Sequence, residues 1–419
     1  MVRPLVFGAA AAAVAGALYW ASRRRRRRAT PKLVLHFDVN ETIMVGDPAG
    51  GDTFEDCLNK MIAKNAFVRA RAAGADPRAA ASAAELTWWD GTPLDDARGG
   101  GARARAPALL SDWEWPEGCV PFYQVAALKR HARRFTDGDG SPGRAYRPLF
   151  ERLEAALRVP EAERARVDAR LCHDGVHWFL VPAFFHALRA LHAARRDFAV
   201  VVRTFGTDGP NVARAIAAWA EGAHPTIGGV PALAASRARA WRIRFADDGG
   251  FALTPEAAAD GAAADGAAAG GALAEEAALA MMEARGAAGP TCAVVSDDYA
   301  WWAAHGESAA AGKPLWLTLA DEATHHVFFD DNIKNDARAS IVATRVRRDA
   351  AAPFAPAPGD ATRQLHGLFL VRCPTFEAVL DPAWFLKQID ACARARAGAR
   401  WQRARARWMR TGELEFSDS

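Results

Sequence analysis

Cysteine is scarce and scattered in this chain of 419 residues, which has six cysteines and no Cys-x-x-Cys pair. This spacing argues against a disulfide framework and a structural zinc site, and it predicts buried thiols in a reducing compartment. The sequence also lacks Gly-x-Ser-x-Gly and His-Glu-x-x-His. A phosphate loop is missing too, because five residues rather than four separate Gly306 from Gly312, and Pro314 stands where Ser or Thr is required.

Lysine is also rare, since only seven of the 53 basic residues are lysine and the rest are arginine. We interpret this bias, together with abundant alanine, as a compositional drift of the source genome. Positions that keep lysine against this drift are of interest, and Lys313 is one of them. The formal net charge of +4 includes Arg3 and the run Arg23 to Arg28. The remainder is therefore slightly acidic, which argues against a nucleic-acid-binding body, and no nucleic-acid partner is predicted.

The N-terminal segment, residues 1–30, combines an uncharged apolar run from Pro4 to Trp20 with the arginine cluster. This run of 17 residues lies at the lower limit for spanning a bilayer. It fits a transmembrane anchor, a cleaved signal or an organelle transit peptide. We expect a retained membrane anchor with the body in the cytosol, because the arginines should stay on that side. Targeting to a mitochondrion or plastid is the main alternative.

Four short apolar runs predict buried strands, at Leu33 to Phe37, Phe198 to Val202, Thr291 to Val295 and Val327 to Phe329. Helical patterns separate them, an order typical of a parallel sheet with right-handed crossovers. We therefore predict an α/β fold with a doubly wound, Rossmann-like parallel sheet. At this length one such core with a large insertion would fit, as would two domains.

The predicted domain organisation has one core interrupted by insertions. The core comprises residues 31–45 and 176–390, and residues 46–175 are expected to form a helical cap insertion. Residues 249–289 are read as an Ala/Gly-rich variable insertion. Residues 391–419 are predicted to form a basic C-terminal helix and tail.

The basic C-terminal helix has two interpretations. Trp401 and Trp408 stand seven residues apart on one face, with arginines around them. The helix could lie on an anionic membrane, or the two tryptophans could pack against the core beneath a solvated charged face. We favour packing.

Polar residues follow the first strand in the pattern Asp38-x-Asn40-x-Thr42. Open parallel sheets place their chemistry at the carboxyl ends of strands, so Asp38 is positioned to react. The spacing resembles the first motif of the haloacid dehalogenase-like (HAD) hydrolases, Asp-x-Asp-x-Thr/Val. Thr204 resembles the second motif, Lys313 in Gly-Lys-Pro the third, and Asp330-Asp331 after the fourth apolar run resembles the last. The match covers most of residues 31 to 345.

The resemblance implies a role for each of these residues. Asp38 would be the nucleophile that forms an aspartyl-phosphate, Thr204 would hold a phosphoryl oxygen, and Lys313 would stabilise the charge on the nucleophile and phosphate. The implied cofactor is Mg²⁺, held by Asp38, the backbone carbonyl of Asn40 and Asp331, while Asp330 either joins them or orients Lys313. The expected partner is a phosphorylated small-molecule substrate. No oligomeric state is predicted.

Asn40 departs from the family pattern, in which an aspartate at this position shuttles a proton. An amide cannot donate that proton, a contribution typically worth about 10²- to 10⁴-fold. The enzyme would then prefer leaving groups that need little protonation, or be slow, or use Glu41 or Asp208 instead.

Three functions stay open. The chain could be a magnesium-dependent phosphohydrolase or phosphotransferase, which we favour. It could be a membrane-tethered, catalytically silent scaffold that keeps the phosphate and metal cradle. It could also be a metal-free dehalogenase-like hydrolase that uses the same aspartate.

Overall fold

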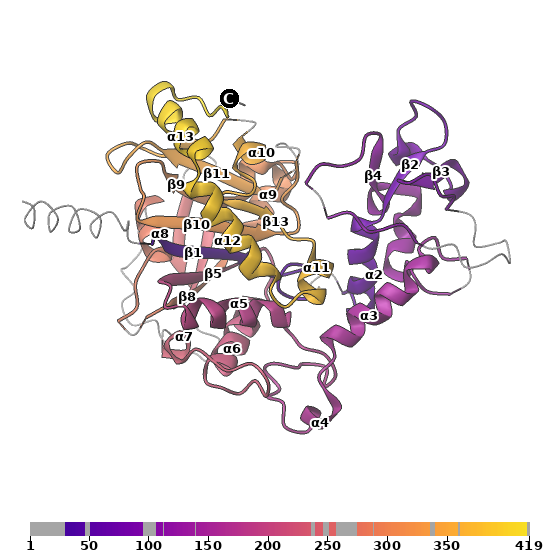
Figure 1. Ribbon diagram of the computed structural model, residues 1–419, viewed down its shortest axis with the longest axis horizontal. Coiled ribbons are helices and arrows are strands. Elements are labelled where there is room, and N and C mark those ends of the chain that lie inside the picture. The colour runs from indigo at the N-terminus through magenta and orange to yellow at the C-terminus, as the bar shows by residue number, and fades with distance from the viewer. Residues whose placement is uncertain are drawn as a thin grey trace, which may run out of the picture.

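The computed structural model describes most of the chain between residues 30 and 416. The described residues are 30–46, 51–94, 106–111, 113–138, 140–235, 239–245, 251–256, 275–287, 289–335, 340–358 and 361–416. Two lobes are visible in Figure 1. The larger contains a broad sheet with helices around it, and the smaller is built from residues that lie between the first two strands of that sheet.

The central sheet has seven strands in the order β13-β10-β1-β5-β8-β6-β7. All neighbouring pairs run parallel except β6 and β7, which are antiparallel. The strands in this order are β13 (Leu370–Arg372), β10 (Thr324–Asp330), β1 (Lys32–Asp38), β5 (Phe198–Thr204), β8 (Thr291–Ser296), β6 (Arg239–Phe245) and β7 (Phe251–Pro255). This mixed α/β architecture with a large, mostly parallel sheet confirms the predicted α/β class.

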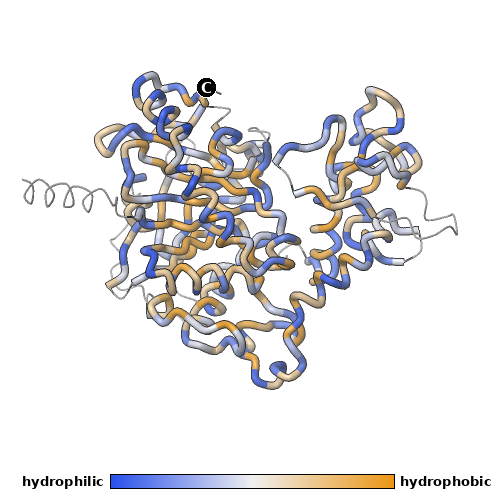
Figure 2. The backbone as a smooth tube through the Cα atoms, viewed as in Figure 1, coloured by the Kyte–Doolittle hydropathy of each residue, from blue (hydrophilic) through white to orange (hydrophobic). Residues whose placement is uncertain are grey.

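Strand β1 occupies the middle of the sheet because its apolar run is covered on both faces. Every residue from Lys32 to Asp38 is buried. On one face, Phe37 contacts Phe184 from α5 (Pro182–Ala193) and Phe385 from α12 (Trp384–Ala397). Figure 2 shows apolar residues concentrated along these inner strands. The alternation of side chains along a strand places Val34 on the opposite face.

The opposite face of the sheet is covered by a second sheet and a helix. The second sheet has the order β12-β11-β9, and Trp316 in β9 joins Val34 and Leu279 of α8 (Glu275–Met282) in one buried cluster. Its strands are β9 (Lys313–Thr318), β11 (Val342–Arg347) and β12 (Ala355–Pro356). The other described helices of this lobe are α6 (Gly209–Ala220), α7 (Pro231–Ala235), α9 (Tyr299–Ala304), α10 (Ala361–Leu365), α11 (Thr375–Leu380) and α13 (Ala399–Thr411).

The smaller lobe mixes helices with strands, whereas residues 46–175 were expected to be helical. Its helices are α2 (Phe54–Asn65), α3 (Arg147–Leu157) and α4 (Glu161–Arg164), with short 3-10 segments such as Phe122–Gln124 and Ala126–Arg134. Its antiparallel sheet has the order β3-β2-β4, with strands β2 (Phe67–Ala70), β3 (Leu86–Trp88) and β4 (Cys119–Pro121). These strands are only three or four residues long. Segments this short are ambiguous from periodicity alone.

Helix α2 begins with a capping box. The Thr53 hydroxyl accepts a hydrogen bond from the backbone N–H of Asp56, whose carboxylate accepts one from the N–H of Thr53. This capping box satisfies two backbone donors that the first helical turn leaves unpaired. The start of α2 is therefore fixed, and with it the direction in which Lys64, near the other end, is presented.

The prediction of a transmembrane helix is corrected. Within the part of the chain that the structure describes, no helix is both long enough and apolar enough to cross a bilayer. The expected span from Pro4 to Trp20 lies outside the described residues.

The basic C-terminal segment forms two helices rather than one. They are α12 and α13, separated at Gly398, whose backbone is extended rather than helical. Trp401 and Trp408 are 2% and 5% exposed, so both pack into the protein, as the favoured interpretation requires. Residues 249–289 are partly structured, because β7 extends the main sheet and α8 packs on it; residues 257–274 lie outside the described residues.

Buried histidines should make the fold sensitive to acid. Burial lowers the pKa of His325 from its usual 6.5 to about 3, and its Nε2 bonds to the carbonyl of Leu368 at 2.8 Å. Between these pH values the unfolded chain binds a proton that the folded protein excludes, so stability is lost as pH falls below about 6.5. At pH 5 the expected loss from this one group is about 2 kcal/mol.

His325→Gln should remove this loss, because glutamine can donate a hydrogen bond but does not titrate. Urea unfolding at about pH 7.5 and about pH 5 measures it. The variant should lose less unfolding free energy than wild type by about 2 kcal/mol, and equal losses would contradict the assignment. Using the difference between the two proteins cancels the contribution of the other titrating groups.

Candidate functional site

The strand order defines where a ligand should bind. From β1 the chain builds outward through β5 and β8 on one side, and later returns to the other side of β1 with β10 and β13. The connections after β1 and β10 therefore diverge, and the carboxyl ends of strands at such a point are where open parallel sheets bind ligands. Asp38 is the last residue of β1 and Asp330 the last residue of β10.

Three carboxylates meet at this point. Phe37 is paired with Phe329 across the two strands, so the next residues along, Asp38 and Asp330, stand side by side. One oxygen atom from each of Asp38, Asp330 and Asp331 can be chosen so that all three lie within 4.8 Å of one another. Asp38 is 6% exposed and Asp330 is fully buried. This concentration of negative charge in a buried place requires cations.

Lys313 is the first of these cations. Its ammonium group lies 2.5 Å from Oδ1 of Asp38 and 2.8 Å from Oδ2 of Asp330, and the residue is only 1% exposed. Burial alone would lower the pKa of Lys313, but Asp330 and Asp38 outweigh it and hold that pKa above its usual value. The side chain is therefore charged and joins the two strand ends.

The backbone around Lys313 explains how it reaches this position. A Cβ atom on Gly312 would lie 1.9 Å from the carbonyl oxygen of Ile341, so only glycine allows β9 to start this close to the neighbouring strand. The Arg203 guanidinium donates to the carbonyl of Pro314 at 2.9 Å and forms an ion pair with Asp297 at 2.5 Å. Both side chains of that pair are buried. Arg203 thus fixes the strand that carries Lys313.

Thr42 connects the loop after β1 to the end of β10. Its hydroxyl donates to Oδ2 of Asp38 at 3.1 Å and accepts from the backbone N–H of Asp331 at 3.1 Å. Thr42 is fully buried. Since Lys313 holds the other oxygen of Asp38, both oxygens of this carboxylate have fixed partners, and its orientation is set.

Asn40 lies in the turn between Asp38 and Thr42, and it is partly buried. The turn is tight, since Glu41 adopts the left-handed conformation with φ at 57° and donates its N–H to the carbonyl of Met44. The residue two positions after Asp38 is therefore an amide in a tight turn.

Thr204 ends the neighbouring strand β5. The sheet register pairs Asp38 with Arg203, so Thr204 lies one residue beyond the level of Asp38. Its hydroxyl oxygen accepts a hydrogen bond from the N–H of Gly206 at 2.9 Å. A Cβ on Gly206 would lie 2.9 Å from a side-chain oxygen of Asp208, so this carboxylate packs closely against the turn. The structure thus places the six predicted site residues at the ends of neighbouring strands or in the segments that adjoin them.

Lys64 was not predicted from the sequence, although it contacts the site directly. It lies near the end of α2, and its ammonium is 3.1 Å from Asp331 and 2.5 Å from Glu41. Burial alone would lower its pKa, but Asp331 and Glu41 outweigh this and raise it. The signal available in the sequence was the rarity of lysine. The smaller lobe therefore supplies a charged group to the site.

Burial disfavours the ionised form of the carboxylates in the site. Burial and the neighbouring Asp330 raise the pKa of Asp38 well above its usual value, against the opposing effect of Lys313. Burial also raises the pKa of Asp331, against the effect of Lys64. Hard divalent cations such as Mg²⁺ prefer carboxylate and carbonyl oxygens. The donor set therefore fits a magnesium ion, which would offset the crowded negative charge.

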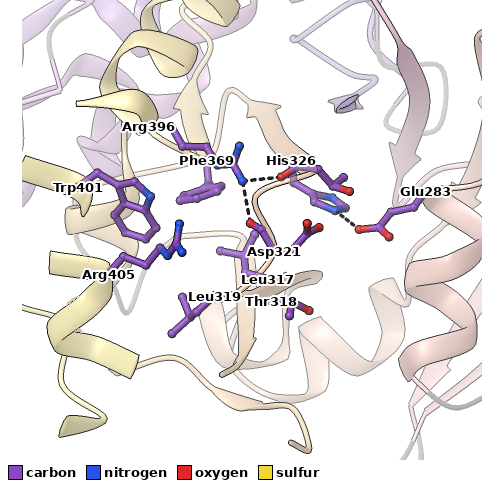
Figure 3. A pocket seen from close by; sticks show the side chains of 11 residues that line it. Glu283, Leu317, Thr318, Leu319, Asp321, His326, Phe369, Arg396, Trp401 and Arg405 are labelled. Atoms are coloured by element: carbon purple, nitrogen blue, oxygen red, sulfur yellow. Dashed lines mark hydrogen bonds and ion pairs between the residues drawn. The ribbon is translucent and has the colours of Figure 1, made fainter. Parts of the chain in front are cut away.

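A hollow lies near the amino-terminal end of β10 (Figure 3). Its lining includes Thr324, the first residue of β10, together with Trp401 and Arg405 from α13. His326 faces it and lies 2.9 Å from Glu283. Because Thr324 and Asp330 are at opposite ends of one strand, this hollow is separate from the carboxylate cluster.

Comparisons with known proteins add no relative. No family model matches the chain, no curated protein matches it, and no solved structure matches it. The function of the protein is therefore inferred from the residues of the site and their geometry.

Proposed function

We propose that the protein is a magnesium-dependent phosphohydrolase or phosphotransferase with a HAD-like fold, acting through an aspartyl-phosphate on Asp38. The observation that supports this most directly is the lysine bridge. Lys313 joins Asp38 to Asp330, with Asp331 in the same cluster, at the carboxyl ends of β1 and β10. Phosphoryl transfer depends mainly on such positioning and charge stabilisation.

Asp38 is the nucleophile in this proposal. One of its carboxylate oxygens forms a bond to phosphorus while the bond from phosphorus to the leaving oxygen breaks, so that the electron pair departs with the leaving group. A water molecule then attacks the phosphorus of the aspartyl-phosphate, releasing inorganic phosphate and restoring the carboxylate. Transfer to another hydroxyl instead of water would make the protein a phosphotransferase.

Neighbouring groups would hold the phosphoryl oxygens. The Thr204 hydroxyl uses its oxygen to accept from Gly206, which leaves its proton to donate to a phosphoryl oxygen. The Lys313 ammonium lies beside the attacking carboxylate and would balance the charge that develops around it.

Asp38, Asp331 and the backbone carbonyl of Asn40 would hold Mg²⁺, with Asp330 close by. The ion would supply positive charge against the phosphoryl oxygens.

Asn40 decides which leaving groups suit the site. No proton can come from its amide, so acyl phosphates and phospho-anhydrides, whose leaving groups are stable as anions, are the expected substrates. Asn40→Asp should raise turnover of a simple alkyl phosphate by about 10²-fold or more, and change that of an acyl phosphate far less. Steady-state rates on the two substrates check this. An active preparation whose alkyl phosphate turnover is unchanged by the substitution would remove support for the missing-acid explanation.

A substrate panel tests the proposed function. The full chain is incubated with Mg²⁺ or with a chelator, and phosphate release is followed from acyl, sugar, nucleotide and lipid phosphates. Magnesium-dependent release is the expected result. Release that is unchanged in chelator would favour the metal-free hydrolase, and magnesium binding without any release would favour a catalytically silent phosphate-binding protein.

A further inference from the structure

The seven lysines of this arginine-rich chain are unevenly placed. Lys32 is buried and donates to backbone carbonyls at the far edge of the sheet, and Lys387 forms a surface ion pair with Asp381. The other five lie on or around the candidate site. They are Lys313 and Lys64, which contact its carboxylates, Lys129, which shares the Tyr123 ring with Lys64, and Lys60 and Lys334, which interact electrostatically with Glu41 and Asp331 respectively. Lysine is a compact point charge with three donors, suited to a single anionic oxygen, whereas arginine presents a flat fork.

A path of cationic groups leads from the carboxylates onto the smaller lobe. The Lys64 ammonium contacts Asp331 and also stands 5.7 Å from the centre of the Tyr123 ring. The Lys129 ammonium stands 4.9 Å from the centre of the same ring. Tyr123 is partly buried and Lys129 is exposed. The Tyr123 ring therefore lies near two ammonium groups. That of Lys64 contacts a carboxylate of the site, and that of Lys129 does not.

The cations of this region differ in whether they are already neutralised. Asp52 forms ion pairs with both Lys60 and Arg133, and Glu41 and Asp331 pair with Lys64. Among the described residues, the Lys129 ammonium has no carboxylate partner. It lies over the ring of Tyr123. The Tyr123 hydroxyl likewise has no hydrogen-bond partner within the described part of the chain.

The placement of Lys129 is not explained by stability. An exposed ammonium on an aromatic ring contributes only about 0.5 to 1 kcal/mol. An anion that sits between the Lys129 ammonium and the Tyr123 hydroxyl would accept hydrogen bonds from both.

We propose that Lys129 and Tyr123 bind a second anionic group of the substrate, a carboxylate or a phosphate, while its phosphoryl group faces Asp38. This inference rests on the proposed function, and it specifies the substrate as a small phosphorylated molecule with a further negative charge at its other end. The two residues set specificity and take no part in the chemical step.

A matched series of substrates tests the proposal. Three aryl phosphates carry a neutral amide, a carboxylate or a second phosphate at the end away from the scissile bond, and kcat and KM are measured on the full chain with Mg²⁺. Lys129→Met, which removes the charge and keeps most of the unbranched side chain, should lower kcat/KM about 10-fold or more for the two charged substrates through KM, and at most about twofold for the neutral one. Tyr123→Phe should act in the same direction, and Lys387→Met is the matched control. The charged substrate that loses more identifies the preferred group.

Binding measurements separate this proposal from the proposed function. Two phosphonates, which cannot be hydrolysed, carry either a methyl group or a carboxylate at the far end, and calorimetry measures their affinity with Mg²⁺ present. Tighter binding of the carboxylate form, lost in Lys129→Met, supports the second anion site even if wild type hydrolyses nothing. The second anion site is overturned if wild type binds the two phosphonates equally or binds neither of them. It is also overturned if Lys129→Met weakens the binding of both to the same extent.

Discussion

Asp38→Asn should reduce phosphate release at least about 10³-fold, because an amide cannot form the aspartyl-phosphate. The substitution changes no volume. It also leaves Lys313 paired with Asp330, so the fold should be retained. Steady-state release with Mg²⁺ and an acyl phosphate measures the effect. Asp381→Asn, which alters an aspartate on the surface, is the control and should keep full activity.

Two results bear on this expectation in opposite ways. Loss of activity with an unchanged unfolding midpoint assigns the effect to chemistry. Undiminished release from Asp38→Asn would show that another group attacks phosphorus, and the carboxylate cluster would then be only a charge-binding feature.

Lys313→Met should damage both stability and activity. It removes the cation between two buried carboxylates, and leaving buried charge without its partner typically costs about 3 to 5 kcal/mol. Activity should fall by at least about 10²-fold, because the charge beside the nucleophile is lost. Denaturant unfolding without added metal and steady-state assays with Mg²⁺ measure the two effects.

Lys387→Met is the matched control for this substitution. Its ammonium pairs with Asp381 on the surface, where an ion pair contributes about 1 kcal/mol or less. The control should therefore keep both stability and activity. If Lys313→Met unfolds at the same denaturant concentration as wild type, the bridge between Asp38 and Asp330 does not hold the strand ends together.

The residues at the strand ends were predictable because their position depends on local pattern. An apolar run followed by Asp38 or by Asp330 predicts a buried strand that ends in a carboxylate, and parallel strands bring such ends to one edge. Lys313 was identified from the family resemblance and from its rarity. The structure shows why it can reach both carboxylates, namely the close approach of Gly312 to Ile341.

The contribution of the smaller lobe was not predictable in the same way. Lys64 lies near the end of α2, and its contact with Asp331 depends on how the smaller lobe packs against the sheet. No periodicity within residues 46–175 encodes that packing. The short strands there were missed for a related reason, since Phe67–Ala70 is too short for alternation to distinguish a strand.

The C-terminal region shows how one residue changes a prediction. Helical periodicity continues across Gly398, so a single helix was expected. The structure breaks the helix there, and the break lets Trp401 turn inward to contact Phe369. Glycine costs about 1 kcal/mol within a helix, which favours such a break when tertiary packing supports it.

The measurement that tests the central claim most directly is the trapping of a phosphoenzyme. The full chain and Asp38→Asn are incubated with Mg²⁺ and a radiolabelled acyl phosphate, quenched in acid, digested, and the labelled peptide is identified. The account predicts one labelled peptide, containing Asp38, with a linkage that base breaks, and no label in Asp38→Asn. The aspartyl-phosphate would be contradicted if the wild type releases phosphate but Asp38 carries no label at any quench time.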